Sequence, residues 1–375
     1  MEKIVVATDS FKGSLSSKEA GDAIAAGVRR ALPGIDVVVV PVGDGGEGTV
    51  RALMDALGAT EVRCRVHGPL ADAVDAVYAI STDGRTAIIE AAAAAGLTLI
   101  EQHRRNPVRT TTFGLGEMIA DALRRGVRRF LVGLGGSATN DGGAGMLAAL
   151  GYEFRDGTGN LMAMPCGADL RRVARIENKN VVPGLAESAF IVACDVDNPL
   201  YGPRGAACVF GPQKGATEDD VAVLDYGLRK LADVMTASGY PDVASMPGAG
   251  AAGGLGAAFA GFLGARLKRG TDMVLETVNF DSILTGASLV ITGEGRIDAQ
   301  TAMGKTPAGI LAAASRHGIP VIAIGGTVDR SVTLPAFAAV IESKPSEMPL
   351  EEAMYPEVAR RNLEEAAFNN FNSYL

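Results

Sequence analysis

The sequence predicts an α/β protein with two α/β domains, the first of them assembled from both ends of the chain. Apolar strand-like runs alternate with helical patterns near both ends, at residues 4–7, 35–42, 288–292 and 320–324. The middle of the chain has a different pattern, because three strand-like runs follow one another at residues 61–66, 74–80 and 85–91 without helical segments between them. We therefore expect residues 1–66 and 286–375 to form one domain, interrupted by a second, mixed domain at residues 67–285.

The N-terminal segment has a strand, helix, strand, helix pattern. Residues 4–7 lead into the polar loop DSFKGS, after which Ser16 and Glu19 have capping-box spacing for a helix that ends near Leu32. Residues 35–42 are rich in valine, as expected for a parallel strand covered on both faces. The loop GDGGEGT then precedes a helix that ends near Leu57. Both polar loops follow strands, so we expect them at the same edge of one sheet.

Residues 130–146, FLVGLGGSATNDGGAGM, have the pattern of a buried strand, a polar glycine loop and a helix. Glycine permits positive φ and close approach of a ligand to the backbone. An isolated cluster of this kind is usually only a turn. Similar loops occur elsewhere, however, with DVDNPL after the strand-like residues 189–194 and FGPQKGA before a helix expected to begin at Thr217.

The C-terminal segment returns to alternation. A strand at residues 288–292 precedes GEGRID, and a helix at residues 307–317 precedes a strand at 320–324. A further strand at residues 338–341 and a terminal helix at 350–371 complete the predicted domain.

Composition excludes several classes of protein. A formal charge of −8 argues against broad nucleic-acid binding. The 4 cysteines form no CxxC pair and there are only 3 histidines, which argues against both a zinc site and a disulfide framework. The N-terminus lacks a signal-peptide pattern, and residues 243–265 are too weakly apolar for a membrane span. We expect a cytoplasmic protein with neither a nucleic-acid nor a membrane partner.

The sequence matches two nucleotide-binding motifs only in part. Gly304, Lys305 and Thr306 have the end of a P-loop, but Ala299 stands at its leading position. Gly133, Gly135 and Ala138 fit the loose GxGxxA dinucleotide pattern, a weak signal when it stands alone. An NAD(P)-dependent oxidoreductase acting on a small hydroxy acid is therefore kept as an alternative function.

The polar loops together contain the groups that phosphoryl transfer requires. Lysines and backbone N–H groups neutralise phosphate oxygens, carboxylates hold Mg²⁺, and one carboxylate accepts the proton of the acceptor hydroxyl. The loop lysines are Lys12, Lys214 and Lys305, and the loop carboxylates are Asp9, Asp44, Glu47, Asp141, Asp195, Glu294 and Asp298. The three histidines lie outside these loops, so no Ser-His-Asp set is indicated.

Seven of these runs, in order along almost the whole chain, resemble the first type of the bacterial glycerate kinase family. They are DSFKGSLSS, DGGEGT, GLGGSATNDGGAGM, ACDVDNPL, FGPQKGAT, GAAGGLG and ITGEGRIDAQTAMGKTP. The resemblance implies a kinase that uses ATP to phosphorylate D-glycerate, with the 2-hydroxyl favoured over the 3-hydroxyl, and the loop carboxylates make Mg²⁺ the expected cofactor. It also implies a discontinuous Rossmann-like α/β domain, an inserted α/β domain and an active site in the interdomain cleft. Thr8 and Gly43 depart from the family's usual Pro and Ala, and neither change removes a reacting group.

The resemblance also implies site residues. Asp195 is favoured as the general base and Asp298 is the second candidate, while Lys12 and Lys214 are expected to clamp phosphate. The expected metal ligands are Asp44 and Asp141. The expected substrate- and nucleotide-binding residues are Asp9, Ser10, Gly45, Gly46, Glu47, Ser137, Asn140, Asn198, Gln213, Lys214, Glu294 and Lys305.

Overall fold

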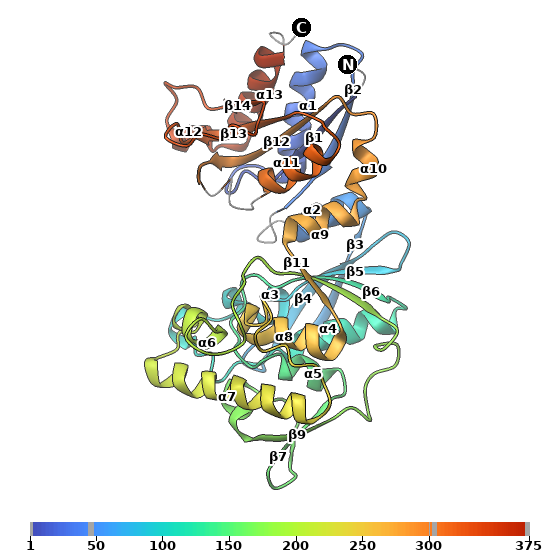
Figure 1. Cartoon of the computed structure of the whole chain (residues 1–375), viewed down its shortest axis with the longest axis vertical. Coiled ribbons are helices and arrows are strands. Elements are labelled where there is room, and N and C mark those ends of the chain that lie inside the picture. The colour runs from blue at the N-terminus through green and yellow to red at the C-terminus, as the bar shows by residue number, and fades with distance from the viewer. Residues whose placement is uncertain (1–2, 44–48, 300, 302–305, 372–375) are drawn as a thin grey trace. The chain divides into compact units, whose positions relative to one another are not determined.

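The computed structural model describes residues 3–43, 49–299, 301 and 306–371. The chain forms two compact units, Met1–Leu57 with Gly270–Leu375, and Gly58–Arg269 (Figure 1). The units divide earlier in the sequence than the expected boundaries at residues 66 and 285. The first boundary moves because β3 (Thr60–His67) pairs with β4 (Ala73–Ile80) in the sheet of the second unit. The second moves because α9 (Gly270–Thr277) and α10 (Phe280–Leu284) pack with helices of the first unit.

The first unit contains a parallel five-stranded sheet in the order β14-β13-β12-β1-β2. Its strands are β1 (Lys3–Thr8), β2 (Asp36–Pro41), β12 (Leu289–Ile297), β13 (Val321–Val328) and β14 (Ala339–Glu342). The chain proceeds from β1 to β2 on one side, and from β12 through β13 to β14 on the other. The direction of strand progression therefore reverses between β1 and β12, which are directly paired. Such a switch point is where open α/β sheets bind ligands, and this order is the 2-1-3-4-5 variant of the doubly wound fold.

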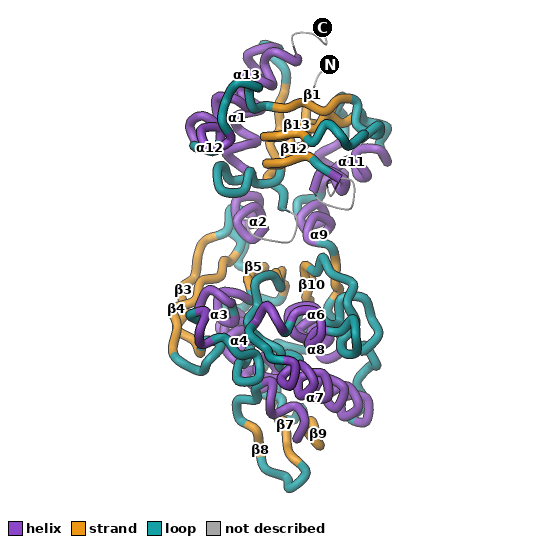
Figure 2. Tube along the Cα trace, turned by 90° about the vertical axis from the view of Figure 1, so that its left-hand side faces the viewer, coloured by secondary structure: helices purple, strands orange, loops and turns teal. Residues whose placement is uncertain are grey.

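Helices cover both faces of this sheet. The helices α1 (Ser17–Ala31) and α13 (Pro356–Phe371) share one apolar cluster with the sheet. The helix α11 (Thr306–Arg316) contacts β12 and β13 outside that cluster. Figure 2 shows the strands between these two sets of helices. The remaining helices of the unit are α2 (Thr49–Leu57) and α12 (Leu350–Ala353).

Two sequence signals explain where helices of the first unit begin. The predicted capping box is confirmed: Ser16 Oγ accepts from the Glu19 N–H at 3.2 Å, and the Glu19 carboxylate accepts from the Ser16 N–H at 3.0 Å. The terminal helix, expected as one element, is instead divided into α12 and α13. Pro356 lies at the first position of α13, because proline lacks the N–H that a continuous helix would need there.

The second unit contains a mixed six-stranded sheet in the order β11-β10-β6-β5-β4-β3. The strands β3, β4 and β5 (Thr86–Glu90) are antiparallel, and the sheet continues in parallel through β6 (Arg129–Gly133), β10 (Ala189–Ala193) and β11 (Arg266–Lys268). A separate antiparallel sheet consists of β7 (Glu153–Asp156), β8 (Leu161–Met162) and β9 (Val173–Glu177). The expected mixed character of this region is confirmed.

The helices of the second unit pack around one apolar core. They are α3 (Ala92–Ala95), α4 (Phe113–Arg124), α5 (Ala144–Ala149), α6 (Ala206–Phe210), α7 (Glu218–Ala237) and α8 (Ala251–Leu263). Short 3₁₀ turns lie at Leu97–Leu99, Gln102–Arg104, Gly167–Arg172 and Pro212–Lys214. Within the described part of the chain, no helix is both long and apolar enough to cross a membrane.

Candidate functional site

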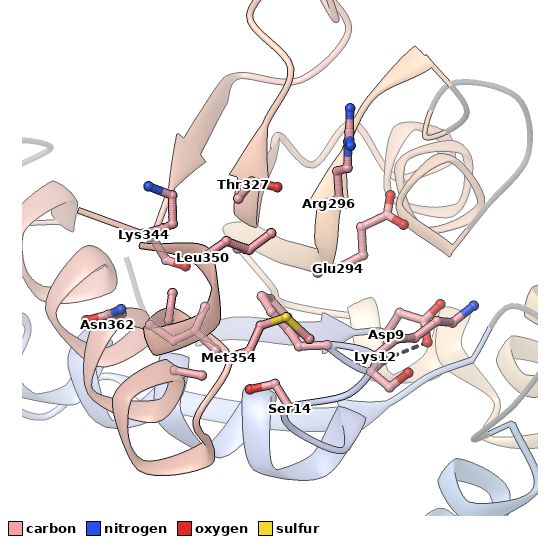
Figure 3. Close-up of a pocket in the computed structure, with 18 of the residues that line it drawn as sticks. Asp9, Lys12, Ser14, Glu294, Arg296, Thr327, Lys344, Leu350, Met354 and Asn362 are labelled. Atoms are coloured by element: carbon pink, nitrogen blue, oxygen red, sulfur yellow. Dashed lines mark hydrogen bonds between the residues drawn. The ribbon is translucent and has the colours of Figure 1, made fainter. Parts of the chain in front are cut away.

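A cavity of about 350 Å³ lies in the first unit, where its parallel strands end (Figure 3). This volume is in the usual range for small-ligand pockets. The polar and charged side chains that line it are Asp9, Ser10, Lys12, Ser14, Glu294, Arg296, Asp298, Thr327, Ser343, Lys344 and Asn362. Five of the expected site residues, Asp9, Ser10, Lys12, Glu294 and Asp298, are thus brought to one cavity.

Asp9 and Glu294 come from the two strands that flank the switch point. Asp9 directly follows β1, and its N–H donates to the carbonyl of Gly293 in β12 at 2.9 Å. Asp9 is 3% exposed and Glu294 is 7% exposed, so both carboxylates are largely removed from water. Backbone pairing therefore holds two acidic residues beside each other at the edge where this fold binds ligands.

Hydroxyl groups fix both carboxylates. Asp9 Oδ2 accepts from Thr306 Oγ1 at 2.7 Å, and its Oδ1 accepts from the Ser10 N–H at 2.6 Å. Glu294 Oε1 accepts from Thr301 Oγ1 at 2.7 Å. These hydrogen bonds fix the orientation of both carboxyl groups. Thr306 and Thr301 lie in the recognised segment that ends in GKTP, but sequence reasoning gave them no role.

Lys12 is placed by a tight loop after β1. The backbones of Phe11 and Leu15 bond to each other in both directions, at 2.9 and 3.0 Å, which closes the loop that carries Lys12. Figure 3 shows Lys12, Arg296, Asp9 and Glu294 grouped at one side of the cavity. Arg296 Nε lies 3.5 Å from Asp298 Oδ2. Positive and negative side chains therefore lie together at this end of the cavity.

The polar loop after β6 has a different environment from the one expected. Ser137 and Asn140 were expected to bind substrate or nucleotide and Asp141 to bind metal, but Ser137 is 5% exposed, and Thr139, Asn140 and Asp141 are fully buried. Gly253 packs closely against this loop. A Cβ added to Gly253 would lie only 2.0 Å from the carbonyl oxygen of Thr139, so no larger residue fits there. Its φ of +73° also favours glycine there. The motif GAAGGLG thus has a packing role beside the loop.

Lys214, which was expected to clamp phosphate, is buried in the same cluster. The side chain is 2% exposed, and Nζ donates to Ser137 Oγ at 2.9 Å and to the Thr139 carbonyl at 2.7 Å. Burial lowers the pKa of Lys214 to about 7, while the carboxylate of Asp141 opposes that shift. In this structure the amine of Lys214 is directed into the protein and joins two loops.

Asp141, which was expected to be a metal ligand, is fully buried and hydrogen-bonded within the fold. One carboxylate oxygen accepts from the N–H and the hydroxyl of Thr112, both at 2.8 Å, and from the Gly145 N–H at 3.1 Å. The other accepts from the Gly143 N–H at 3.1 Å. Burial raises the pKa of Asp141, and the hydrogen bonds from Thr112 and the glycines oppose this. The carboxylate joins the N-terminal ends of α4 and α5, so its acceptor capacity is used within the fold.

Asn140 differs from its neighbours because its side chain lacks partners. Neither its amide nitrogen nor its amide oxygen has a hydrogen-bond partner among the described residues, and the same holds for Thr139 Oγ1. Burying unpaired polar groups is unfavourable by about 1–3 kcal/mol each.

The other expected residues of the second unit lie nearer the surface. Asp195 and Gln213 are exposed, and Asn198 is half-buried, with its amide donating to the Arg204 carbonyl at 2.7 Å. Asp44, Gly45, Gly46, Glu47 and Lys305 lie outside the described residues. Among the residues that are described, no group of three or more His, Cys, Asp or Glu side chains is placed to hold a metal ion.

Comparisons with known proteins agree on one family. The family model described as "Glycerate kinase family" matches residues 4–374. A glycerate kinase of Bacillus subtilis (strain 168) is 48% identical over 354 residues, which cover 94% of this chain and 92% of that protein. A glycerate 2-kinase of Escherichia coli (strain K12) is 46% identical over 330 residues, covering 88% and 86%. A crystal structure of a Salmonella typhimurium LT2 protein assigned as glycerate kinase 2 is 43% identical, with a TM-score of 0.91 and coverage of 100% of this chain and 98% of that one. The chain belongs to the glycerate kinase family.

Proposed function

We propose that this chain transfers the γ-phosphoryl group of ATP to D-glycerate. The observation that carries the proposal within the structure is the pair of buried carboxylates, Asp9 and Glu294, at the switch point of the first unit's sheet. Lys12 lines the same cavity. Family membership supplies the reaction class, and it argues against the oxidoreductase alternative.

The reaction places definite demands on side chains. A hydroxyl oxygen of glycerate attacks the γ-phosphorus, the bond to the bridging oxygen breaks, and ADP leaves. The hydroxyl proton passes to a carboxylate, for which Asp195 and Asp298 are the candidates. Lys12 neutralises charge on the transferred group, an effect that requires a cation placed before reaction begins. Asp298 lines the cavity with Lys12, whereas Asp195 follows β10 in the second unit.

Mg²⁺ fits the donor set of this cavity. Magnesium prefers oxygen ligands and is commonly bound through one or two protein carboxylates together with substrate phosphates and water. Asp9 and Glu294 supply two such carboxylates, and they would hold the ion. When bound, the ion would neutralise phosphate charge. Lys12 and Arg296 provide further positive charge at the same end of the cavity.

We further propose the 2-hydroxyl of glycerate as the acceptor, so that the product is 2-phosphoglycerate. The family resemblance favours this position, and the E. coli relative is named a glycerate 2-kinase. Phosphorus NMR of the product decides between the two hydroxyls. Proton coupling splits the signal into a doublet for the 2-phosphate, which has one adjacent hydrogen, and into a triplet for the 3-phosphate, which has two.

The decisive test of the function is ADP release on addition of D-glycerate, measured with and without Mg²⁺. We expect ADP formation that depends on both glycerate and Mg²⁺. L-glycerate and glycerol serve as acceptor controls, and a titration with NADH tests for dinucleotide binding. No glycerate-dependent ADP release would refute the proposal, and tight NADH binding would favour the alternative.

Two matched substitutions test the identity of the base. Asp195→Asn and Asp298→Asn each remove a proton acceptor while nearly preserving side-chain size. We expect one of them to lower kcat by at least about 100-fold, the usual contribution of a positioned general base. Near-normal turnover in both variants would eliminate both assignments.

A further inference from the structure

The cavity of the first unit has two chemically different ends. Figure 3 shows Asp9, Lys12, Glu294 and Arg296 at one side, and Leu350 and Met354 toward the other, where Lys344 and Asn362 also lie. The amine of Lys344 donates to the carbonyls of Pro345 and Met348, both at 3.1 Å. Phe11, Ala353 and Leu363 add further apolar surface to its lining. A single ligand that fills this space would have one highly charged part and one apolar part.

The apolar end has side chains that the fold leaves uncovered. Leu350 is 57% exposed and Met354 is 40% exposed, although both line the cavity. Large apolar side chains gathered in this way at a pocket indicate a surface that a ligand covers. Methionine is well suited to this role, because its flexible thioether packs against aromatic rings.

We propose that this end binds the adenine base of ATP, an inference that rests on the proposed function. D-glycerate has only three carbons, each bearing oxygen, and it offers no apolar group to cover Leu350 and Met354. The base of ATP is a flat aromatic group attached through ribose to a polyphosphate chain. Placing the base at α12 directs the phosphates toward Lys12 and Arg296, which lie with Asp9 and Glu294 at the other side of the cavity (Figure 3).

The middle of the cavity supplies a polar group suited to the ribose. Ser14 lines the cavity, and its hydroxyl is buried with no hydrogen-bond partner in the described ranges of the chain. The loop that carries it is close to α12, since a Cβ added to Gly13 would lie 3.0 Å from the terminal methyl of Met354. A ribose hydroxyl located between the base and the phosphates would satisfy Ser14 Oγ. The order along the cavity is then base at α12, ribose at Ser14, and phosphates at Lys12.

The test measures nucleotide binding in the absence of glycerate. Leu350→Glu and Met354→Glu each place a polar, charged group at the proposed base site, on side chains exposed enough to tolerate it. Calorimetric titration with ADP should show a Kd raised at least about 10-fold in each variant, a difference of about 1.4 kcal/mol. Tyr355→Glu is the matched control, because Tyr355 is 58% exposed beside Met354 and is not part of the cavity lining. Its Kd for ADP should stay within about 2-fold of the wild-type value.

Inorganic tripolyphosphate separates the two ends of the cavity. Because it lacks a base, its binding should change by less than about 2-fold in Met354→Glu, whereas adenosine binding should weaken as much as ADP binding. The KM for glycerate should also stay within about 2-fold of wild type. If Met354→Glu leaves ADP binding unchanged, or weakens tripolyphosphate as much as ADP, the base does not lie at α12.

This experiment distinguishes failure of the inference from failure of the function. A wild-type protein that binds ADP with the expected dependence on Leu350 and Met354, but does not phosphorylate glycerate, would retain the base site and refute the glycerate kinase proposal. Normal glycerate turnover with unchanged ADP binding in both variants would refute the base site alone. A protein that binds no ADP would overturn the inference.

Discussion

Lys214 Nζ donates a hydrogen bond of 2.9 Å to Ser137 Oγ, joining two loops that are 77 positions apart in the sequence. The same nitrogen donates to the Thr139 carbonyl at 2.7 Å. Two acceptors match the two hydrogens of a neutral amine, consistent with burial that lowers the pKa of Lys214 to about 7. The lysine thereby holds the turn at Pro212–Lys214 against the loop that contains Asn140 and Asp141.

The stability contribution of Lys214 should depend on pH. Its folded pKa of about 7 lies below the ordinary lysine value of 10.5, so the unfolded chain binds more protons between these pH values. The contribution of Lys214 to the free energy of unfolding therefore rises with pH between about 7 and 10.5. Below pH 7 the folded protein carries the whole cost of burying the charged amine. The stability of wild type relative to Lys214→Met should increase by roughly 1 kcal/mol per pH unit between pH 7.5 and 9.5. Urea unfolding at several pH values measures this.

A surface lysine provides the control for that experiment. Lys18 is exposed and lies 2.6 Å from Asp22, so Lys18→Met should give a stability difference that changes little over the same range. Parallel pH profiles for wild type and Lys214→Met would mean that Lys214 stays charged in the folded protein.

Asp141→Asn should destabilise the fold by about 3 kcal/mol. Both carboxylate oxygens of Asp141 accept hydrogen bonds, from Thr112, Gly143 and Gly145. In asparagine one of these oxygens becomes an NH₂ group, which is itself a donor and would face an N–H donor without an acceptor between them. Thermal or urea unfolding without metal measures the loss. Asp83→Asn, in an exposed turn, is the control and should cost less than about 1 kcal/mol. An unchanged unfolding midpoint, with activity restored by raised Mg²⁺, would instead identify Asp141 as a metal ligand.

Asn140→Leu should separate folding from function. Because both polar atoms of this buried side chain lack partners within the described residues, an apolar side chain of similar size should leave the free energy of unfolding unchanged or raise it by about 1 kcal/mol. We expect kcat/KM for glycerate to fall, since an unpaired buried amide would be retained for a functional contact. Stability and glycerate kinetics on the same preparation test both expectations. Full activity with raised stability would show that the amide has no functional role.

Lys12→Ala should lower kcat by at least about 100-fold if this lysine neutralises the transferred phosphoryl group. The Lys12 side chain is exposed, so the substitution should change the free energy of unfolding by less than about 1 kcal/mol. Lys18→Ala, on the neighbouring helix α1, is the control for loss of one positive charge. Steady-state kinetics that match wild type would remove Lys12 from the mechanism.

The sequence by itself determined the elements and the family. Local signals were sufficient for this, because a capping box such as that of Ser16 and Glu19 and the strand runs that become β1 and β12 act over a few residues. The seven ordered motifs likewise identified the family without knowledge of any contact. The broken terminal helix shows the limit of such signals, since Pro356 begins a new helix within a pattern that was interpreted as continuous.

Only the tertiary structure decided where the polar loop residues lie and what they contact. Burial and pairing depend on segments far apart in the chain, so residues of equal polarity in the sequence lie in different environments. Asp9 and Glu294 line a cavity because parallel pairing of β1 and β12 sets them side by side. Lys214 and Asp141, equally polar, are enclosed by packing and hold loops together. The apolar surface of Leu350 and Met354 carried no motif and could be found only from the cavity that it lines.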